Sequence, residues 1–206
     1  MDLSYFDKQA PVMRELGISD KALDKVKDYT QSLWTANAEL NLFSRKMPFN
    51  ELVDNHIIDC LLPLKYFPNN VKTVADFGSG GGLPSVILAL QFPDLKFILY
   101  EKSPKKQSFL KALKSMAPNM EVRSDIPIKL LNVDLITARA FKPVDVILDM
   151  SRHYYENEGK YFLLKGRREK INEEIALAQK KFKNLSCRVI ELKSPVLEVE
   201  RNLVLL

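Results

Sequence analysis

The sequence contains little of the chemistry that metal sites and disulfide-stabilised folds require. Its 206 residues include only two cysteines, Cys60 and Cys187, and two histidines, His56 and His153. Cysteines this far apart form neither a disulfide framework nor a metal cluster, and they suit a reducing cytosol. Neither histidine has a second metal ligand at a suitable spacing, so we expect no metal site.

Long apolar runs are absent as well. No stretch approaches the roughly 18 apolar residues of a membrane span. Residues 1–5 do not start a signal peptide, which would have a basic region followed by an apolar one. We therefore expect a cytoplasmic protein without a membrane partner, and a monomer. With 46% hydrophobic residues, the chain can bury the core of one domain, with or without an appendage.

Glycine is scarce too, yet four of the seven glycines lie within residues 78–82. They follow the apolar run Val71–Phe77 and precede the apolar segment Pro84–Phe92, which predicts a strand, a tight turn and the start of a helix. Glycine permits sharp bends and lets a ligand approach the backbone closely. The free N–H groups at a helix start favour an anionic or hydrogen-bond-accepting ligand. The segment therefore predicts a site for a nucleotide-like cofactor.

The spacing of these glycines distinguishes between cofactor classes. A dinucleotide fingerprint, G-x-G-x-x-G, would need a third glycine where Leu83 stands. The pattern D-x-G-x-G-x-G, formed by Asp76, Gly78, Gly80 and Gly82, instead resembles motif I of the class I S-adenosylmethionine-dependent methyltransferases. The resemblance implies that Asp76 lies near the amino group of the cofactor and that the glycines contact its methionine part. The alternative is a loop that merely turns the chain.

A second acidic residue follows the glycine loop at an informative distance. Leu95–Tyr100 predicts a strand, and Glu101 ends it. In βαβ units an acid about 20 residues beyond the glycines binds the ribose hydroxyls, and one carboxylate can accept from two adjacent hydroxyls. Glu101 is thus a candidate cofactor-binding residue. The alternative is an ordinary exposed acid beside Lys102.

Strands and helices alternate from residue 71 onward, which indicates a mostly parallel sheet with helices on both faces. The turn at Ser194-Pro195 is too short for a parallel crossover, so the last two strands must pair antiparallel. This is the Rossmann-like α/β fold of the class I methyltransferases, with seven strands of which the last is antiparallel. The expected strands are 72–77, 96–101, 120–123, 133–138, 160–165, 187–193 and 199–206, and the expected helices are 84–91, 104–116, 143–154 and 168–183.

We assign residues 69–206 to this core and residues 1–68 to an N-terminal helical extension. The extension is predicted to form helices at 5–16, 20–42 and 48–66. Ser19 is suited to cap the second helix, and Pro48 is suited to the first turn of the third.

The net charge of +5 and the pI near 9.1 make a polyanionic partner plausible. Lysines on the expected helix 104–116 are explained by a solvated helix face. The cluster Lys165-Gly166-Arg167-Arg168 is different, because it ends a strand at the sheet edge where open α/β sheets bind ligands.

Over most of its length from residue 37, the chain resembles the bacterial 16S ribosomal RNA guanine-N7 methyltransferase family, called RsmG or GidB. The Leu83-Pro84 pair and the Arg139-Ala140-Phe141 triplet are the specific parts. The matching segments are 37–42, 55–59, 76–84, 101–106, 109–110, 138–141, 164–166 and 200–204.

This resemblance implies an enzyme that uses S-adenosylmethionine to convert a guanine of 16S ribosomal RNA to 7-methylguanosine, acting on naked RNA or on the 30S subunit. It makes Gly78 and Leu83 cofactor contacts, and Arg139 a cofactor and catalytic residue. Asp125 and Ile126 would flank the adenine, although the family often has Arg-x-Glu where this chain reads Arg-Ser-Asp. Ring nitrogen 7 carries no proton, so its methylation needs orientation rather than a base.

Six residues are candidate RNA contacts. Asn41, Arg45 and His56 would belong to an RNA-facing cleft, although a helix cap and packing contacts explain His56 and Asp59 equally well. Lys165, Arg167 and Arg201 would contact phosphates. Two other functions remain open: a non-catalytic RNA- or ribosome-binding protein with a degenerate cofactor pocket, and a methyltransferase acting on a substrate other than RNA.

Overall fold

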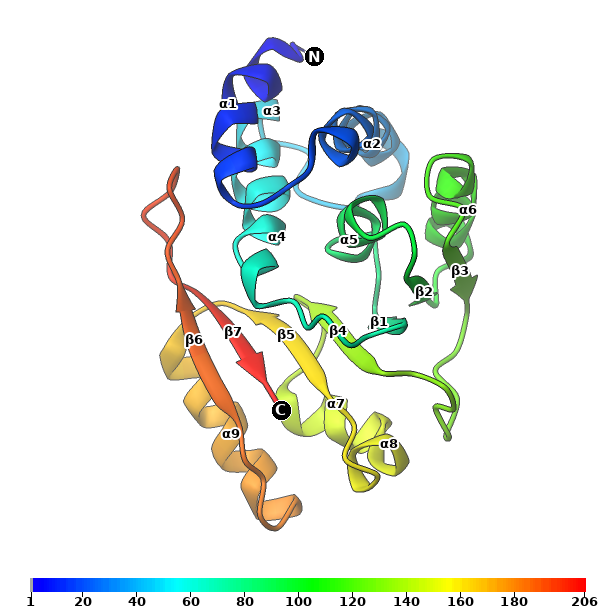
Figure 1. The fold of residues 1–206 in the computed structure, drawn as a ribbon, viewed down its shortest axis with the longest axis vertical. Helices are drawn as coiled ribbons and strands as arrows, with labels where there is room; N and C mark the ends of the chain where they lie inside the picture. The colour runs from blue at the N-terminus through cyan, green and yellow to red at the C-terminus, as the bar shows by residue number, and fades with distance from the viewer. Residues whose placement is uncertain (1) are drawn as a thin grey trace.

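The computed structural model describes residues 2–206, in which a helical N-terminal part packs on an α/β part (Figure 1). The N-terminal elements are α1 (Ser4–Glu15), α2 (Asp20–Leu40), α3 (Phe49–Leu52), the π-helix η1 (Val53–Ile58), α4 (Asp59–Leu61) and the 3-10 helix η2 (Leu64–Tyr66).

Helix α2 begins as predicted but ends two residues early. The Ser19 side chain accepts a hydrogen bond from the Ala22 N–H at 3.3 Å, which confirms the predicted cap. At the other end Asn41 adopts a left-handed conformation with φ 51°. The Asn37 carboxamide then accepts the N–H groups of Leu42 and Phe43, at 2.7 and 3.0 Å. The chain therefore leaves the helix before Leu42, which lies on the segment that follows α2.

The third predicted helix is not one continuous helix, so this prediction was wrong in its detail. Pro48 precedes α3 as its N-cap, and the π-helix η1 follows at once. A π turn contains more residues than an α turn, and such turns are short insertions inside α-helices. The insertion shifts the helical phase part-way along the segment, so a single constant helical period cannot reveal it.

The sheet confirms the predicted fold class. Its seven strands have the order β3-β2-β1-β4-β5-β7-β6. β7 is antiparallel to both of its neighbours, and the other pairs are parallel. The strands are β1 (Thr73–Phe77), β2 (Lys96–Tyr100), β3 (Met120–Arg123), β4 (Leu135–Arg139), β5 (Tyr161–Lys165), β6 (Arg188–Leu192) and β7 (Arg201–Leu205).

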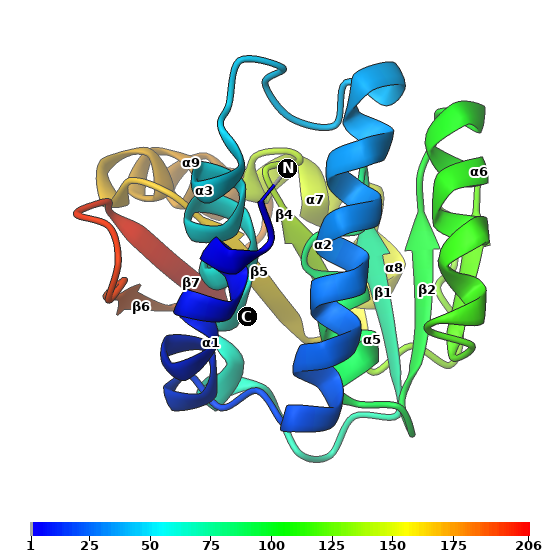
Figure 2. The same cartoon turned by 90° about the horizontal axis from the view of Figure 1, so that it is seen from above.

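Helices cover both faces of the sheet, and Figure 2 shows α2 and α6 alongside β1 and β2. The remaining helices are α5 (Ser85–Gln91), α6 (Pro104–Ala112), η3 (Leu113–Ser115), α7 (Val144–Met150), α8 (Arg152–Glu156) and α9 (Arg168–Lys181). Alternate strand residues point to opposite faces. Val74 accordingly packs with the extension, α5 and α6, while Ala75 and Phe77 pack with α7, α8 and α9.

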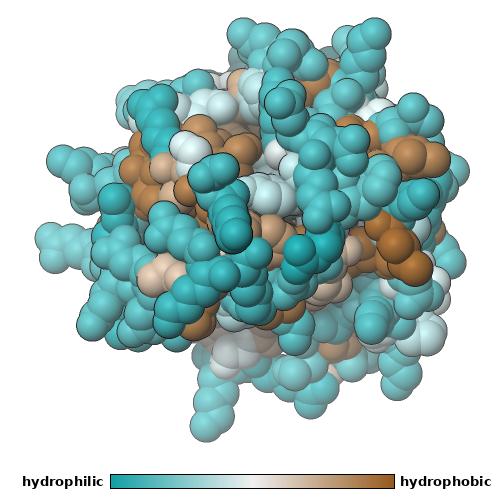
Figure 3. All heavy atoms as spheres, turned by 90° about the horizontal axis from the view of Figure 1, so that it is seen from below, coloured by the Kyte–Doolittle hydropathy of each residue, from teal (hydrophilic) through white to brown (hydrophobic). Residues whose placement is uncertain are grey.

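The extension shares one hydrophobic cluster with the core, since buried residues of α1 and α2 pack with those of α5, β1 and β2. The division at residues 68 and 69 therefore stays a prediction. On the face seen from below, hydrophilic side chains dominate and apolar atoms appear in small patches (Figure 3). Within residues 2–206 no helix is both long enough and apolar enough to cross a membrane.

Candidate functional site

The glycine loop leaves β1 at the carboxyl edge of the sheet and is compressed from several sides. Gly78, Gly80 and Gly82 have φ values of 71°, 55° and 99°, which other residues rarely adopt. A Cβ atom on Gly78 would collide with the Phe141 ring, and one on Gly82 would collide with Val86. At Gly80 the nearest atom to such a Cβ would be 3.9 Å away. The loop is thus packed at its two ends and open at Gly80.

Above Gly80 lies a cavity of about 640 Å³, which we call the glycine-loop pocket. Its floor and rim come from the core and include Gly78, Gly80, Leu83, Glu101, Asp125 and Ile126. One wall comes from the extension and consists of Leu33, Leu42, Phe43 and His56. Arg139, Ala140, Phe141 and Lys142 close the remaining side.

Of the extension residues in this wall, His56 was predicted from the sequence, as an RNA contact, whereas Leu33, Leu42 and Phe43 were not predicted. Tyr29 on α2 donates a hydrogen bond to the Gly81 carbonyl at 2.8 Å, and a Cβ on Gly81 would lie 2.7 Å from Leu33. Phe43 stacks near Trp34, with ring centroids 6.0 Å apart. The only sequence signal was Asn37, whose side chain turns the chain so that Leu42 and Phe43 reach the pocket.

Glu101 lies at the rim of the glycine-loop pocket and braces the loop. One carboxylate oxygen accepts the Gly80 N–H and the other the Ser103 N–H, both at 2.8 Å. A carboxylate has about four acceptor positions, so each oxygen can still accept another hydrogen bond. The ribose-binding role of Glu101 stays a prediction.

Asp76 and Gly82, two predicted cofactor contacts, do not reach the pocket surface. Strand alternation directs the Asp76 side chain beneath the loop, where it is 1% exposed. Neither carboxylate oxygen has a hydrogen-bond partner of good geometry. The Ser79 hydroxyl contacts the Asp76 backbone carbonyl instead, and the Ser85 hydroxyl is also unpartnered. Burial raises the Asp76 pKa to about 7, against a smaller lowering by the two hydroxyls.

Arg139 ends β4 and points toward the extension. Its Nε and Nη2 atoms donate to one oxygen of Asp59 at 3.0 and 2.8 Å, and Nη2 also donates to the Asn55 carbonyl at 2.9 Å. Nη2 lies 3.0 Å from His56 Nδ1 as well. Nη2 has two hydrogens for these three acceptors, so one hydrogen is shared, and His56 Nδ1 can take part only as an acceptor because a guanidinium only donates. Burial, and then the Arg139 charge, lower the His56 pKa to about 4, so this histidine is neutral near pH 7.

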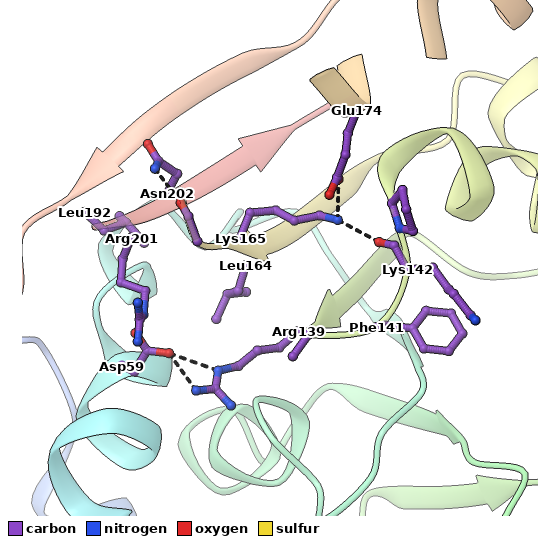
Figure 4. Close-up of a pocket in the computed structure, with 13 residues that line it drawn as sticks. Asp59, Arg139, Phe141, Lys142, Leu164, Lys165, Glu174, Leu192, Arg201 and Asn202 are labelled. Carbon is purple, nitrogen blue, oxygen red and sulfur yellow. Dashed lines mark hydrogen bonds and ion pairs between the residues drawn. The ribbon is translucent and has the colours of Figure 1, made fainter. Parts of the chain in front are cut away.

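A second cavity, of about 390 Å³, adjoins the first, and we call it the strand-end pocket. It lies at the ends of β4 and β5 and the start of β7, and Figure 4 shows the Arg139 and Arg201 side chains converging on Asp59 there. Arg201 Nε donates to the second Asp59 oxygen at 2.5 Å. The two pockets share Arg139, Ala140, Phe141 and Lys142, which therefore separate them.

The basic residues predicted to contact RNA lie in different environments. Lys165 is 13% exposed, pairs with Glu174 at 2.7 Å and donates to the Lys142 carbonyl. Arg201 pairs with Asp59. Arg167 is exposed at the start of α9 and makes no ion pair with residues 2–206. These basic residues are thus less cationic than the sequence implied, because Glu174 pairs with Lys165 and Asp59 pairs with Arg201.

Asn41 and Arg45 are exposed on the segment between α2 and α3, and His56 lines the glycine-loop pocket. Lys142, which the sequence did not single out, is exposed and lines both pockets. Across residues 2–206 no three His, Cys, Asp or Glu side chains are grouped so as to hold a metal ion.

Comparison with protein families matches residues 22–204 to the family described as "rRNA small subunit methyltransferase G". "Ribosomal RNA small subunit methyltransferase G 1" of Bdellovibrio bacteriovorus is 59% identical over 98% of both chains. The protein called "Ribosomal RNA small subunit methyltransferase G" in Brachyspira hyodysenteriae is 32% identical over 92% of both.

Solved structures share the fold at low sequence identity. A putative O-methyltransferase from Klebsiella pneumoniae has a TM-score of 0.59 and 13% identity, covering 97% of this chain and 94% of that one. Fibrillarin from Aeropyrum pernix, solved with natively bound S-adenosyl-L-methionine, has a TM-score of 0.53 and 12% identity over 72% of each chain. These structures support a class I methyltransferase fold.

The buried Asp76 predicts a pH-dependent effect on stability. Its folded-state pKa of about 7 exceeds the ordinary aspartate pKa of 3.8, so the native state binds the proton more tightly and loses stability as pH rises through this interval. Asp76→Asn cannot ionise. In urea unfolding without cofactor, its free energy of unfolding relative to wild type should increase by roughly 2–3 kcal/mol between pH 5 and pH 8, since one pKa unit is about 1.4 kcal/mol.

Asp24→Asn, at an exposed position on α2, is the matched control and should show the same difference at both pH values. A pH-independent difference for Asp76→Asn would contradict the burial of an uncompensated carboxylate.

Proposed function

The chain belongs to the rRNA small subunit methyltransferase G family, and from this premise we propose that it transfers a methyl group from S-adenosylmethionine to ring nitrogen 7 of a guanine in 16S ribosomal RNA. The observation that carries the proposal is the pair of adjoining pockets at the carboxyl edge of the sheet. One lies on the glycine loop, the other lies beyond Arg139, and the two share a single wall.

The glycine-loop pocket offers the space and the side chains that binding of S-adenosylmethionine requires. Gly80 leaves space for the methionine part, since no atom lies within 3.9 Å of where its Cβ would be. Glu101 offers acceptors for the ribose hydroxyls, and Asp125 and Ile126 line the same cavity for the adenine. When bound, the cofactor supplies a methyl group activated by a sulfonium. Asp76 is buried beneath the loop and does not line this pocket.

The strand-end pocket fits the acceptor base. Nitrogen 7 of guanine has a free lone pair, so the protein needs to align it with the methyl group rather than remove a proton. Guanine also carries the acceptor O6 beside nitrogen 7. Arg139 Nη1 has no partner within residues 2–206 and belongs to a side chain that lines both pockets, so it suits a hydrogen bond to O6. Phe141 offers a ring against which the base can stack.

Exposed cations around the two pockets support an RNA substrate. The exposed Lys102 and Lys142 and the half-buried Lys106 line the glycine-loop pocket. Arg167 is exposed and follows Gly166, which lines the strand-end pocket. Arg45 is exposed on the extension side. Phosphate contacts from such groups position RNA without reading its sequence. An unpaired guanine can then turn into the pocket, because nitrogen 7 lies on its Hoogsteen edge.

The direct test is tritiated methyl transfer to RNA from cells that lack the enzyme, followed by mapping of the modified base. We expect label at nitrogen 7 of one guanine in small-subunit RNA and none in large-subunit RNA. Parallel reactions with naked RNA and 30S subunits identify the better substrate. Cofactor binding without methyl transfer to either substrate would favour a non-catalytic RNA- or ribosome-binding protein. Methyl transfer to protein or to a small molecule would favour a methyltransferase that acts on a substrate other than RNA.

Gly80→Val should abolish cofactor binding. The branched side chain would enter the space above the loop, and the φ of 55° disfavours any Cβ. Calorimetry should show at least a hundredfold weaker affinity for S-adenosylmethionine in a protein that still folds. Gly17→Val is the matched control, because Gly17 also has a positive φ, 100°, but lies outside this pocket. Equal losses in both variants would refute a specific role for Gly80.

Lys142→Ala combined with Arg167→Ala should weaken RNA binding and leave cofactor affinity unchanged. Both cations are exposed and have no ion-pair partner in residues 2–206, so their charge is available to phosphates. The slope of log affinity against log salt should become shallower by about 1 to 2 units, since each lost contact removes about 0.7–0.9.

The control is Lys21→Ala with Lys183→Ala, two exposed lysines that line neither pocket. If both double variants bind RNA with the wild-type salt slope, the RNA path lies elsewhere.

A further inference from the structure

Three neighbouring groups of the extension hold Arg139 at four contact points. The Asn55 carbonyl, His56 Nδ1 and an Asp59 carboxylate oxygen lie within 3.0 Å of its Nε or Nη2 atom. A guanidinium has five N–H donors in a rigid planar fork. With Nε and Nη2 engaged, only the Nη1 hydrogens are left for a ligand. The direction of Nη1 is therefore fixed by residues 55–59, far from Arg139 in sequence.

The local fold explains how residues so close in sequence surround one side chain. Asn55 and His56 belong to the π-helix Val53–Ile58, and Asp59 begins α4 directly after it. Inserted π turns redirect side chains and are frequent at functional sites. Neutral His56 can accept from Arg139, whereas a protonated imidazole could not.

Asp59 connects this arrangement to the second pocket. One of its oxygens binds Arg139 at the end of β4, and the other binds Arg201 at the start of β7. The side chains of Arg139 and Asp59 are 14% and 8% exposed. One buried carboxylate therefore holds two cations on different strands and offsets one of their two positive charges. Removing its charge would leave both arginines without their shared partner, which is costly inside a protein.

We propose that Asp59 is a positioning residue for methyl transfer: it directs Arg139 Nη1 to the junction of the two pockets, and its second oxygen holds Arg201 at the edge of the strand-end pocket. This inference rests on the proposed function and goes beyond it by assigning a role in the reaction to a residue of the extension. Asp59 does not touch the substrate. It acts through Arg139, so its loss should affect turnover more than cofactor affinity.

Two variants separate positioning from folding. Asp59→Glu keeps the charge and moves the carboxylate by one methylene, so the melting temperature should stay close to wild type while kcat falls about tenfold. Asp59→Asn removes the charge, and its kcat should fall about a hundredfold, because small misplacements of an orienting group have effects of this size. In both, the Kd for S-adenosylmethionine should change less than about threefold.

Asp149→Asn is the matched control, because Asp149 is a surface carboxylate that also binds two cations, Arg152 and Lys181, and it lines neither pocket. We expect its kcat to stay within about threefold of wild type. Wild-type kcat in a folded Asp59→Glu or Asp59→Asn protein would overturn the proposal. So would an Asp149→Asn variant that loses kcat as fully as Asp59→Asn.

A second measurement does not depend on activity. In NMR spectra of arginine side chains, the Nε–H signal of Arg139 should be protected from exchange in wild type. It should lose this protection in Asp59→Asn and keep it in Arg152→Ala, which removes a surface arginine of α8. An unprotected Arg139 signal in wild type would refute the positioning role. Wild-type protein that transfers no methyl group but shows the protected signal would refute the proposed function alone.

Discussion

The glycine loop is the point on which the rest of this structure depends, because three separate parts of the chain press against it. Phe141 from the end of β4 occupies the space beside Gly78, Leu33 from α2 lies against Gly81, and Val86 from α5 lies against Gly82. A side chain at any of these positions would force two elements apart. The loop thus holds the extension, the sheet edge and the first core helix together, and both pockets are arranged around it.

Features determined by local sequence could be predicted well. The seven strands lie within a few residues of their predicted positions, because most are short apolar runs bounded by turn residues. The Ser19 cap and the glycine loop could be predicted equally well, since each depends on residues adjacent in sequence. The antiparallel pairing of β6 with β7 followed from the length of one connection.

Features that depend on distant partners could not be predicted from the sequence. Nothing in the sequence around Lys165 indicates that it forms an ion pair with Glu174, which lies on α9. Nothing near Arg139 indicates that residues 55–59 surround it, because a π turn has no clear sequence signal. The burial of Asp76 was different, since strand alternation alone directs it beneath the loop. The resemblance to motif I implied a cofactor contact for Asp76, whereas its position in β1 already predicted that the side chain is buried.

The hydrogen bond from Tyr29 to the Gly81 carbonyl, together with the contact between Leu33 and Gly81, has a consequence for the history of the chain. A larger residue at position 81 would require a smaller one at position 33, and the reverse. The two parts must therefore change together through evolution. An extension taken from a distant relative would not fit this core, so a chimera of the two would inherit a distorted loop even if each part retained its own helices and strands.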